Sequence, residues 1–237
     1  MSIAINIICG LILLISIWSG YKRGLILSAA NLVAIVVSLY LACLLSAAFS
    51  GEVVSGLYPF ADGYIDTKIE TTVMPEMGLG ADLSVKDALA ANPDRAVEFC
   101  TKTYRAAGIA RGPAEQMAEE AIAYSTEQLT DIPTAISQIF CERMAYVAGT
   151  VIAFILVLVL LLAIGNIPNL TFRVPNHPRL DDIGGAVMGL IDGMAYCVLL
   201  CWALQFMGAL IGHDTLENTF FSKLFLSIDI LTIGVGI

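Results

Sequence analysis

The chain has 237 residues, of which 58% are hydrophobic and only 14% charged, and its formal net charge is −9. A soluble domain of this size usually carries about 25% charged residues, and one folded core cannot bury the apolar excess behind a mean hydropathy of +0.82. The acidic balance argues against nucleic acid as a partner, because phosphates need clustered Lys and Arg. The composition therefore predicts a protein whose partner is the lipid bilayer.

Four stretches without charged side chains are candidates for crossing that bilayer: 1–21, 24–51, 144–172 and 193–213. A helix needs about 20 apolar residues to cross about 30 Å of hydrocarbon, and irregular backbone cannot face lipid because its polar groups would lack partners. We therefore expect an all-α polytopic membrane protein. Transmembrane helices one and two occupy 1–50, and helices three and four occupy 144–213.

The positive charges predict how these helices are oriented. Lys22 and Arg23 follow the first stretch rather than precede it, which favours a retained helix over a cleaved signal peptide. The connection between helices three and four carries Arg173 and Arg179 together with three prolines. Short basic loops are usually cytoplasmic, so both termini and the segment between helices two and three should lie outside.

That intervening segment, 51–143, holds seven Lys or Arg against fifteen Asp or Glu, a balance of 7 − 15 = −8. Its pattern predicts helices beginning near Asp94, Pro113 and Pro133, the last running directly into helix three, and a loop from Gly56 to Gly80. The expected buried faces are Val97, Cys100, Tyr104 and Ala107 in the first helix and Ala114, Met117, Ala118, Ala121 and Ile122 in the second.

Two interpretations of this insert remain open: a helical cap against the outer membrane surface, or a docking domain for envelope protein partners. Cys100 and Cys141 lie outside the apolar stretches and could form a disulfide in an oxidising compartment. Beyond helix four, residues 214–237 carry apolar side chains at helical spacing interrupted by charge, which predicts an amphipathic helix in the membrane interface.

The fourth helix carries a ridge of glycines, Gly185, Gly189 and Gly193, at every fourth position. Such a ridge lets another helix approach closely within the membrane. The partner helix could belong to the same chain or to a second copy in a homo-oligomer. Asp181 or Asp182 is placed to cap the start of this helix.

Asp192 stands about 12 Å inside the same helix at about 1.5 Å per residue, where an acid is costly and often functional. Its candidate hydrogen-bond partners are Asn6 in helix one, Asn31 in helix two and Gln205 further along helix four. A protonated Asp192 paired with Asn31 would join helices two and four, whereas an Asp192 in a wet cavity could bind a cation or relay a proton.

No catalytic constellation accompanies these residues, so we expect a protein that is not an enzyme and has no catalytic residues, cofactor or metal. The chain lacks a Gly-x-Ser-x-Gly elbow and a phosphate-binding glycine loop. His177 and His213 fall in loops on opposite sides of the membrane. Cys197 and Cys201 share a helix face, but two thiols alone make a poor metal site and are more often core residues.

Two segments together resemble the colicin V production protein (CvpA) family: Gly20-Tyr-Lys-Arg23-Gly24 before helix two, and Asp181-Asp-Ile-Gly-Gly-Ala-Val-Met-Gly-Leu-Ile-Asp-Gly193 at the start of helix four. The resemblance covers the four helices but not most of the insert. It implies a bacterial inner-membrane protein, linked to colicin V production or export and to envelope homeostasis.

This chain departs from the family at Asp182 and Asp192, because the family commonly has basic residues at both positions. Any function that those basic residues share is in doubt here. The alternative hypothesis is a small oligomeric transporter or channel component that uses Asp192.

Overall fold

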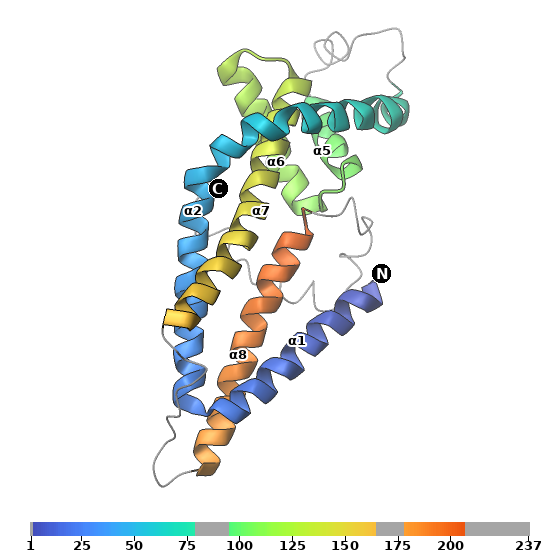
Figure 1. Cartoon of the computed structure of the whole chain (residues 1–237). Helices are drawn as coiled ribbons and strands as arrows, with labels where there is room; N and C mark the ends of the chain where they lie inside the picture. The colour runs from blue at the N-terminus through green and yellow to red at the C-terminus, as the bar shows by residue number, and fades with distance from the viewer. Residues whose placement is uncertain (1, 79–94, 165–177, 207–237) are drawn as a thin grey trace. The chain divides into compact units, whose positions relative to one another are not determined.

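The computed structural model describes residues 2–78, 95–164 and 178–206, and every regular element in these ranges is helical (Figure 1). The elements in chain order are α1 (Ser2–Arg23), α2 (Leu25–Lys68), the π-helix η1 (Ile69–Val73), α3 (Met74–Met77), α5 (Ala96–Ala106), α6 (Arg111–Gln128), α7 (Ile132–Ile164) and α8 (Pro178–Leu204). The Pro-rich loop with Arg173 and His177, and the predicted tail helix at 214–237, lie outside the described residues.

Among the described residues, four helices are long and apolar enough to cross a membrane: Ile3–Arg23, Leu25–Met77, Ile132–Ile164 and Arg179–Leu204. Large apolar side chains stand exposed along them, including Leu14 on α1, Val33 on α2 and Leu156 on α7. Such a density of exposed apolar surface is expected of helices that face lipid. The prediction of an all-α polytopic membrane protein is confirmed.

The chain divides into two compact units. Of the described residues, unit 1 contains 2–47, 148–164 and 178–203, and unit 2 contains 48–78, 95–147 and 204–206. The sequence analysis placed the corresponding boundaries at 50/51 and 143/144. Both α2 and α7 contribute residues to each unit, so the boundaries fall within continuous helices rather than in linkers. The predicted run of the helix near Pro133 into helix three is confirmed by α7, which is unbroken from Ile132 to Ile164.

The expected loop from Gly56 to Gly80 is wrong, because α2 continues to Lys68 and is followed by η1 and α3. Pro59 lies inside α2, where it lacks an N–H and weakens the helix. The helix persists because Ile65, Ile69 and Val73 are almost fully buried at four-residue spacing in unit 2. Tertiary burial of this stripe outweighs the local glycine and proline signals.

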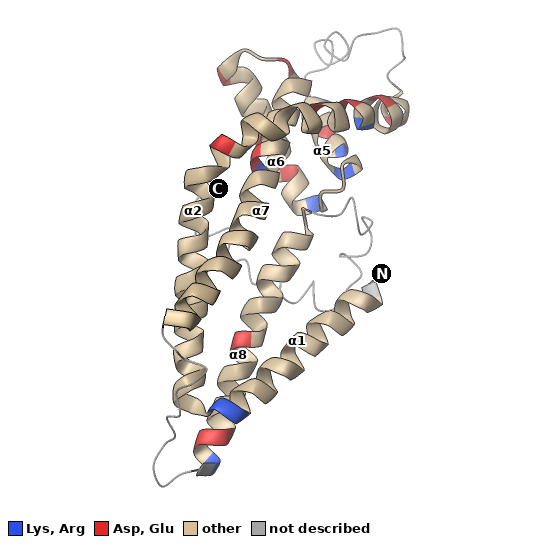
Figure 2. Ribbon diagram, viewed as in Figure 1, with Lys and Arg blue, Asp and Glu red and all other residues tan. Residues whose placement is uncertain are grey.

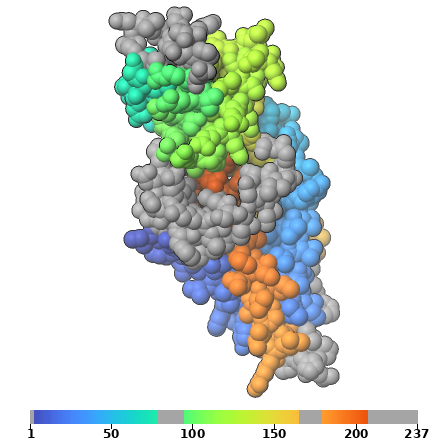
Figure 3. Space-filling view, turned by 180° about the vertical axis from the view of Figure 1, so that it is seen from behind, coloured from blue at the N-terminus to red at the C-terminus, as the bar shows by residue number. Residues whose placement is uncertain are grey.

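The core of unit 2 is built from α5, α6 and the nearby parts of α2 and α7. Helices α5 and α6 lie side by side in the space-filling view (Figure 3). The buried face of α5 consists of Ala96, Phe99, Cys100, Thr103 and Tyr104. Val97, expected on this face, is instead 46% exposed. The predicted face of α6 holds for Ala114, Met117, Ala118 and Ala121, all buried.

Polar contacts fasten these helices to one another. The Tyr104 hydroxyl donates to the Ile136 carbonyl of α7 at 3.1 Å, and burial raises the pKa of this tyrosine well above its usual value. Arg143 of α7 forms an ion pair with Glu120 of α6. Because the Arg143 side chain is only 17% exposed, this pair is less screened by water than one on an open surface.

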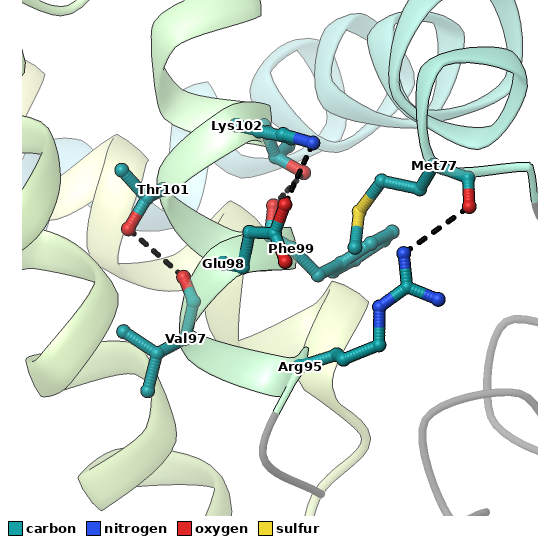
Figure 4. A network of polar contacts seen from close by, with 8 residues as sticks. Met77, Arg95, Val97, Glu98, Phe99, Thr101 and Lys102 are labelled. Atoms are coloured by element: carbon teal, nitrogen blue, oxygen red, sulfur yellow. Dashed lines mark hydrogen bonds and ion pairs between the residues drawn. The ribbon is translucent and has the colours of Figure 1, made fainter. Parts of the chain in front are cut away.

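A small network joins the start of α5 to the end of α3 (Figure 4). The Arg95 guanidinium donates to the Met77 carbonyl at 3.2 Å, so it caps a carbonyl that has no partner within its own helix. One turn later, Lys102 lies 2.8 Å from Glu98 and lowers the pKa of that carboxyl through a hydrogen bond. The Arg95 contact links two segments that are separated by residues 79–94.

Leu129 ends α6 in the left-handed region, at φ 53°, and its side chain is 92% exposed. A left-handed conformation costs an L-residue about 1–2 kcal/mol, and glycine avoids that cost. Leu129→Gly should therefore raise the free energy of unfolding by about 0.5–1 kcal/mol after the entropy cost of glycine, measured by thermal denaturation. Glu127→Gly, inside the same helix, should instead lower it by about 1 kcal/mol. Equal losses for both variants would contradict the prediction.

Cys100 and Cys141, considered above as a disulfide pair, are both free and buried. Burial raises the pKa of the Cys100 thiol to about 12, so at pH 8 roughly one thiol in 10⁴ is ionised. We expect iodoacetamide to modify Cys100 only after denaturation, as measured by peptide mass mapping. Val97→Cys, on the exposed face of α5, should be modified in the folded protein. Rapid modification of Cys100 before denaturation would show that unit 2 opens locally.

Candidate functional site

The glycine ridge of α8 packs against α1 within the same chain. The two helices lie side by side in unit 1 (Figure 1). A Cβ built at Gly189 would lie 3.0 Å from the Gly20 Cα and would overlap the Ser16 carbonyl, and one built at Gly185 would overlap the Gly20 carbonyl. One at Gly193 would lie 3.0 Å from the Ser16 Cβ. The two backbones therefore touch where no side chain separates them.

The turn between α1 and α2 is a single residue, Gly24, at φ 85°. Its N–H donates to the Gly20 carbonyl at 3.0 Å, and its conformation is one that glycine adopts freely. A Cβ at Gly24 would lie 2.5 Å from Asp181 Oδ2. The turn is thus closed by a side chain that approaches from α8.

Asp181 caps the start of α2 rather than its own helix. The Leu25 N–H donates to Asp181 Oδ1 at 2.9 Å, and so satisfies one of the free donors at the first turn of α2. Asp181 is 1% exposed, and its Oδ2 has no hydrogen-bond partner among the described residues. The sequence predicted that an aspartate here caps the fourth helix. Asp181 does cap a helix, but that helix is α2 and not α8.

Asp192 lies on the buried side of α8 and meets α2. Asn31 Nδ2 donates to Asp192 Oδ2 at 2.8 Å, and both residues are only 5% exposed. Tyr196, one turn further along α8, hydrogen-bonds to the Asn31 side chain. Arg23, at the end of α1, interacts electrostatically with Asp192. The structure thus brings together two residues paired in the sequence analysis and adds Arg23 and Tyr196 to them.

The charged residues of unit 1 are few and are grouped. In Figure 2 the ribbons of α1 and α8 are tan over most of their length, and the coloured positions lie at the α1–α2 turn, at the start of α8 and at one place within α8. Lys22 at the turn lies 5.1 Å from the centre of the Trp18 ring, a favourable cation–π distance. The Lys22 charge therefore lies against an aromatic ring of its own helix.

The opposite face of α8 is apolar and exposed, and its orange surface is visible in Figure 3. It is formed by Leu180, Ile183, Val187, Leu190 and Ile191, between 36% and 64% exposed. Because α1 covers the glycine ridge, a homo-oligomer through the fourth helix would have to use this apolar face. Such an oligomer stays a prediction.

Three buried thiols lie between α1 and α8. Cys197 Sγ donates to the Cys9 carbonyl at 3.7 Å, and Cys9, Cys197 and Cys201 are all fully buried. Within the described ranges, no group of three or more His, Cys, Asp or Glu side chains could hold a metal ion. Cys197 therefore packs against the backbone of α1.

Sequence reasoning missed that α1 is the partner of the ridge. In the first helix, Ser16, Gly20 and Gly24 repeat small residues at four-residue spacing, just as Gly185, Gly189 and Gly193 do in the fourth. Two such repeats of equal period are the signal that predicts a close helix pair. The approach of Arg23 to Asp192 had no comparable sequence signal.

Comparisons with family models, with curated proteins and with solved structures found no match for this chain.

Proposed function

We propose that this chain is a non-enzymatic, multi-pass protein of the bacterial inner membrane that supports colicin V production or export and envelope homeostasis. The observation that carries the proposal is the contact between the two segments that resemble the colicin V production family. Gly20 and Gly24 on one segment touch Gly185 and Gly189 on the other. The two motifs lie about 160 residues apart in the chain. They support the family resemblance more strongly when they contact each other, because the close contact accounts for the glycines in both.

In this proposal the α1–α2 turn is cytoplasmic and unit 2 lies outside the membrane. The turn carries Lys22 and Arg23, which favour the cytoplasmic side, and Lys22 covers Trp18 in the way expected at a membrane interface. Unit 2 is acidic and would then present its surface to envelope proteins. Single cysteines introduced at the turn and in α6 test this orientation. A membrane-impermeant maleimide added to intact cells should modify the cysteine in α6 and not the one at the turn.

The departure from the family at Asp192 changes the local chemistry of the site. A basic residue at this position would repel Arg23, whereas Asp192 attracts it. The proposal therefore assigns the shared activity to the glycine contact rather than to a charge at position 192.

Complementation tests the proposal. A bacterial strain that makes colicin V but lacks its own family member should regain toxin release when this chain is expressed. Gly185→Ala should fail to restore release, because it disrupts the α1–α8 contact, and the neighbouring Gly184→Ala should restore it. If the wild-type chain reaches the membrane at normal abundance and toxin release stays absent, the proposal is wrong.

A second candidate function is a small oligomeric transporter or channel component that uses Asp192. It is favoured by one observation: Asp192 Oδ1 is buried and has no hydrogen-bond partner among the described residues. Purified protein in liposomes should then show a pH-dependent ion flux that Asp192→Asn abolishes. Liposomes that show no such flux would exclude this function.

A further inference from the structure

The environment of Asp192 is unusual for a side chain whose role is helix packing alone. One carboxylate oxygen, Oδ2, accepts a hydrogen bond from Asn31, and the other, Oδ1, is buried without a partner in the described structure. Burying a polar atom without a hydrogen bond is unfavourable, because the atom loses its bonds to water and gains none in return. A side chain kept only to join α2 and α8 would gain from a second bond here, so the free oxygen points to a ligand.

The chemistry of the neighbours decides which ligand fits. Asn31 offers an N–H to the carboxylate, and Arg23 brings a positive charge. A divalent cation needs about six or more oxygen ligands. In the described part of unit 1, the other buried side-chain oxygens without partners are Ser38 Oγ, Thr150 Oγ1 and Asp181 Oδ2. Asp181 stands eleven residues before Asp192 on α8, about 16 Å along the helix. Ser38 is seven residues beyond Asn31, about 10 Å along the helix. The site therefore suits a proton and not a metal ion.

Neither protonation state of Asp192 is locked by hydrogen bonds. The carboxylate leaves Oδ1 without a donor, and the carboxylic acid leaves the same atom without an acceptor. The balance then depends on charge: burial disfavours the ion, and Arg23 favours it. The charged or titratable groups that face Asp192 in the described structure are Arg23 from α1 and Tyr196 from α8, and α2 contributes Asn31, which does not titrate.

We propose that Asp192, with one oxygen bonded to Asn31 and the other buried without a partner in the described structure, is a proton-binding site within unit 1. A proton adds to Oδ1, the carboxylate loses its charge, and the electrostatic attraction between Asp192 and the Arg23 charge is lost. When the proton leaves, the attraction returns. A protein that moves no ions can still bind a proton. A negative result in the toxin-release or ion-flux experiment would therefore not exclude the proton-binding site.

A hydrophobic carbodiimide tests the site on the full-length protein in liposomes. This reagent reacts with protonated carboxyl groups: the carboxyl oxygen bonds to the carbodiimide carbon, the acid proton passes to nitrogen, and nothing leaves. We expect the peptide that contains Asp192 to gain the reagent's mass at acidic pH and several-fold less at alkaline pH. Asp192→Asn should abolish the modification, and it keeps the hydrogen-bonding shape, so the protein should still fold.

Arg23→Gln tests the electrostatic interaction between Arg23 and Asp192, and Lys22→Gln is its matched control. Removal of the Arg23 charge should let Asp192 stay protonated, and hence modified, at a higher pH than in the wild type. Lys22→Gln removes an equal charge that lies over Trp18, and should leave the pH profile nearly unchanged. Equal shifts for both variants would overturn the link to Arg23.

Infrared difference spectroscopy covers the case in which the reagent cannot reach the site. A carboxylic-acid band that changes with pH in the wild type and is missing in Asp192→Asn supports the proposal. Modification and a carboxylic-acid band that do not change with pH would overturn it, because Asp192 would then be a permanent acid that joins two helices. The absence of both the modification and the band at every pH would also overturn it.

Discussion

Replacing Gly185 with alanine should lower the free energy of unfolding in detergent by about 1–3 kcal/mol, the usual cost of an overpacked contact. The added methyl group would overlap the Gly20 carbonyl and would lie 2.8 Å from the Gly24 carbonyl carbon. These are backbone atoms, so no side-chain rotation can relieve the overlap, and α1 and α8 must move apart. Loss of helicity during denaturation with SDS measures the change.

Gly184→Ala is the matched control for this prediction. Its new methyl group would lie 2.9 Å from Leu25 Cδ1, which is the end of a flexible side chain and can rotate away. Gly10→Ala is a second control, since nothing lies within 4 Å of the added atom. We expect both controls to stay within about 0.5 kcal/mol of the wild type. If Gly185→Ala behaved like them, α1 and α8 would not be in close contact.

Removal of the Asp181 side chain should destabilise the protein by about 0.5–2 kcal/mol, as the loss of a helix cap does. Asp181→Ala leaves the Leu25 N–H, now bonded at 2.9 Å, without an acceptor at the start of α2. Asp181→Asn should cost less, because its amide oxygen can still accept that bond. The same SDS denaturation compares the two variants.

Asp182→Ala provides the neighbouring control, because Asp182 is only half-buried and it is Asp181 that accepts the bond from Leu25. It should change stability by less than about 0.5 kcal/mol.

A double-mutant cycle that combines Asp181→Ala with Gly24→Ala tests whether these two residues are in contact. A methyl group at Gly24 would lie 2.5 Å from Asp181 Oδ2, so the two changes should not be additive. Additive losses, or an Asp182→Ala loss as large as that of Asp181→Ala, would contradict the cap across helices.

These two predictions concern the same contact, in which α8 packs against the turn between α1 and α2. The glycine ridge allows close approach, and Asp181 then reaches Leu25. If either element fails, the other loses its geometry. Variants of both should therefore be compared in the toxin-release assay, where a loss with normal membrane insertion would connect this contact to function.

The order and composition of the residues were enough to predict that the protein is helical and lies in a membrane. Charge-free stretches of about 20 residues leave a bilayer-spanning helix as the stable solution, because the backbone must satisfy its own hydrogen bonds in lipid. The sequence also singled out Asp192 and the glycine ridge, since an acid deep in an apolar helix and a regular run of glycines are local features. Their positions depend on the order of residues alone.

Only the tertiary structure decided what these residues meet. Whether the ridge touches α1 or a second copy, whether Asp181 caps α8 or α2, and whether Arg23 faces Asp192 all depend on contacts between segments far apart in the chain. The end of α2 shows the same limit. Local signals at Pro59 predicted a loop, but burial of Ile65, Ile69 and Val73 keeps the segment helical, because packing energy outweighs the local propensity of a few residues.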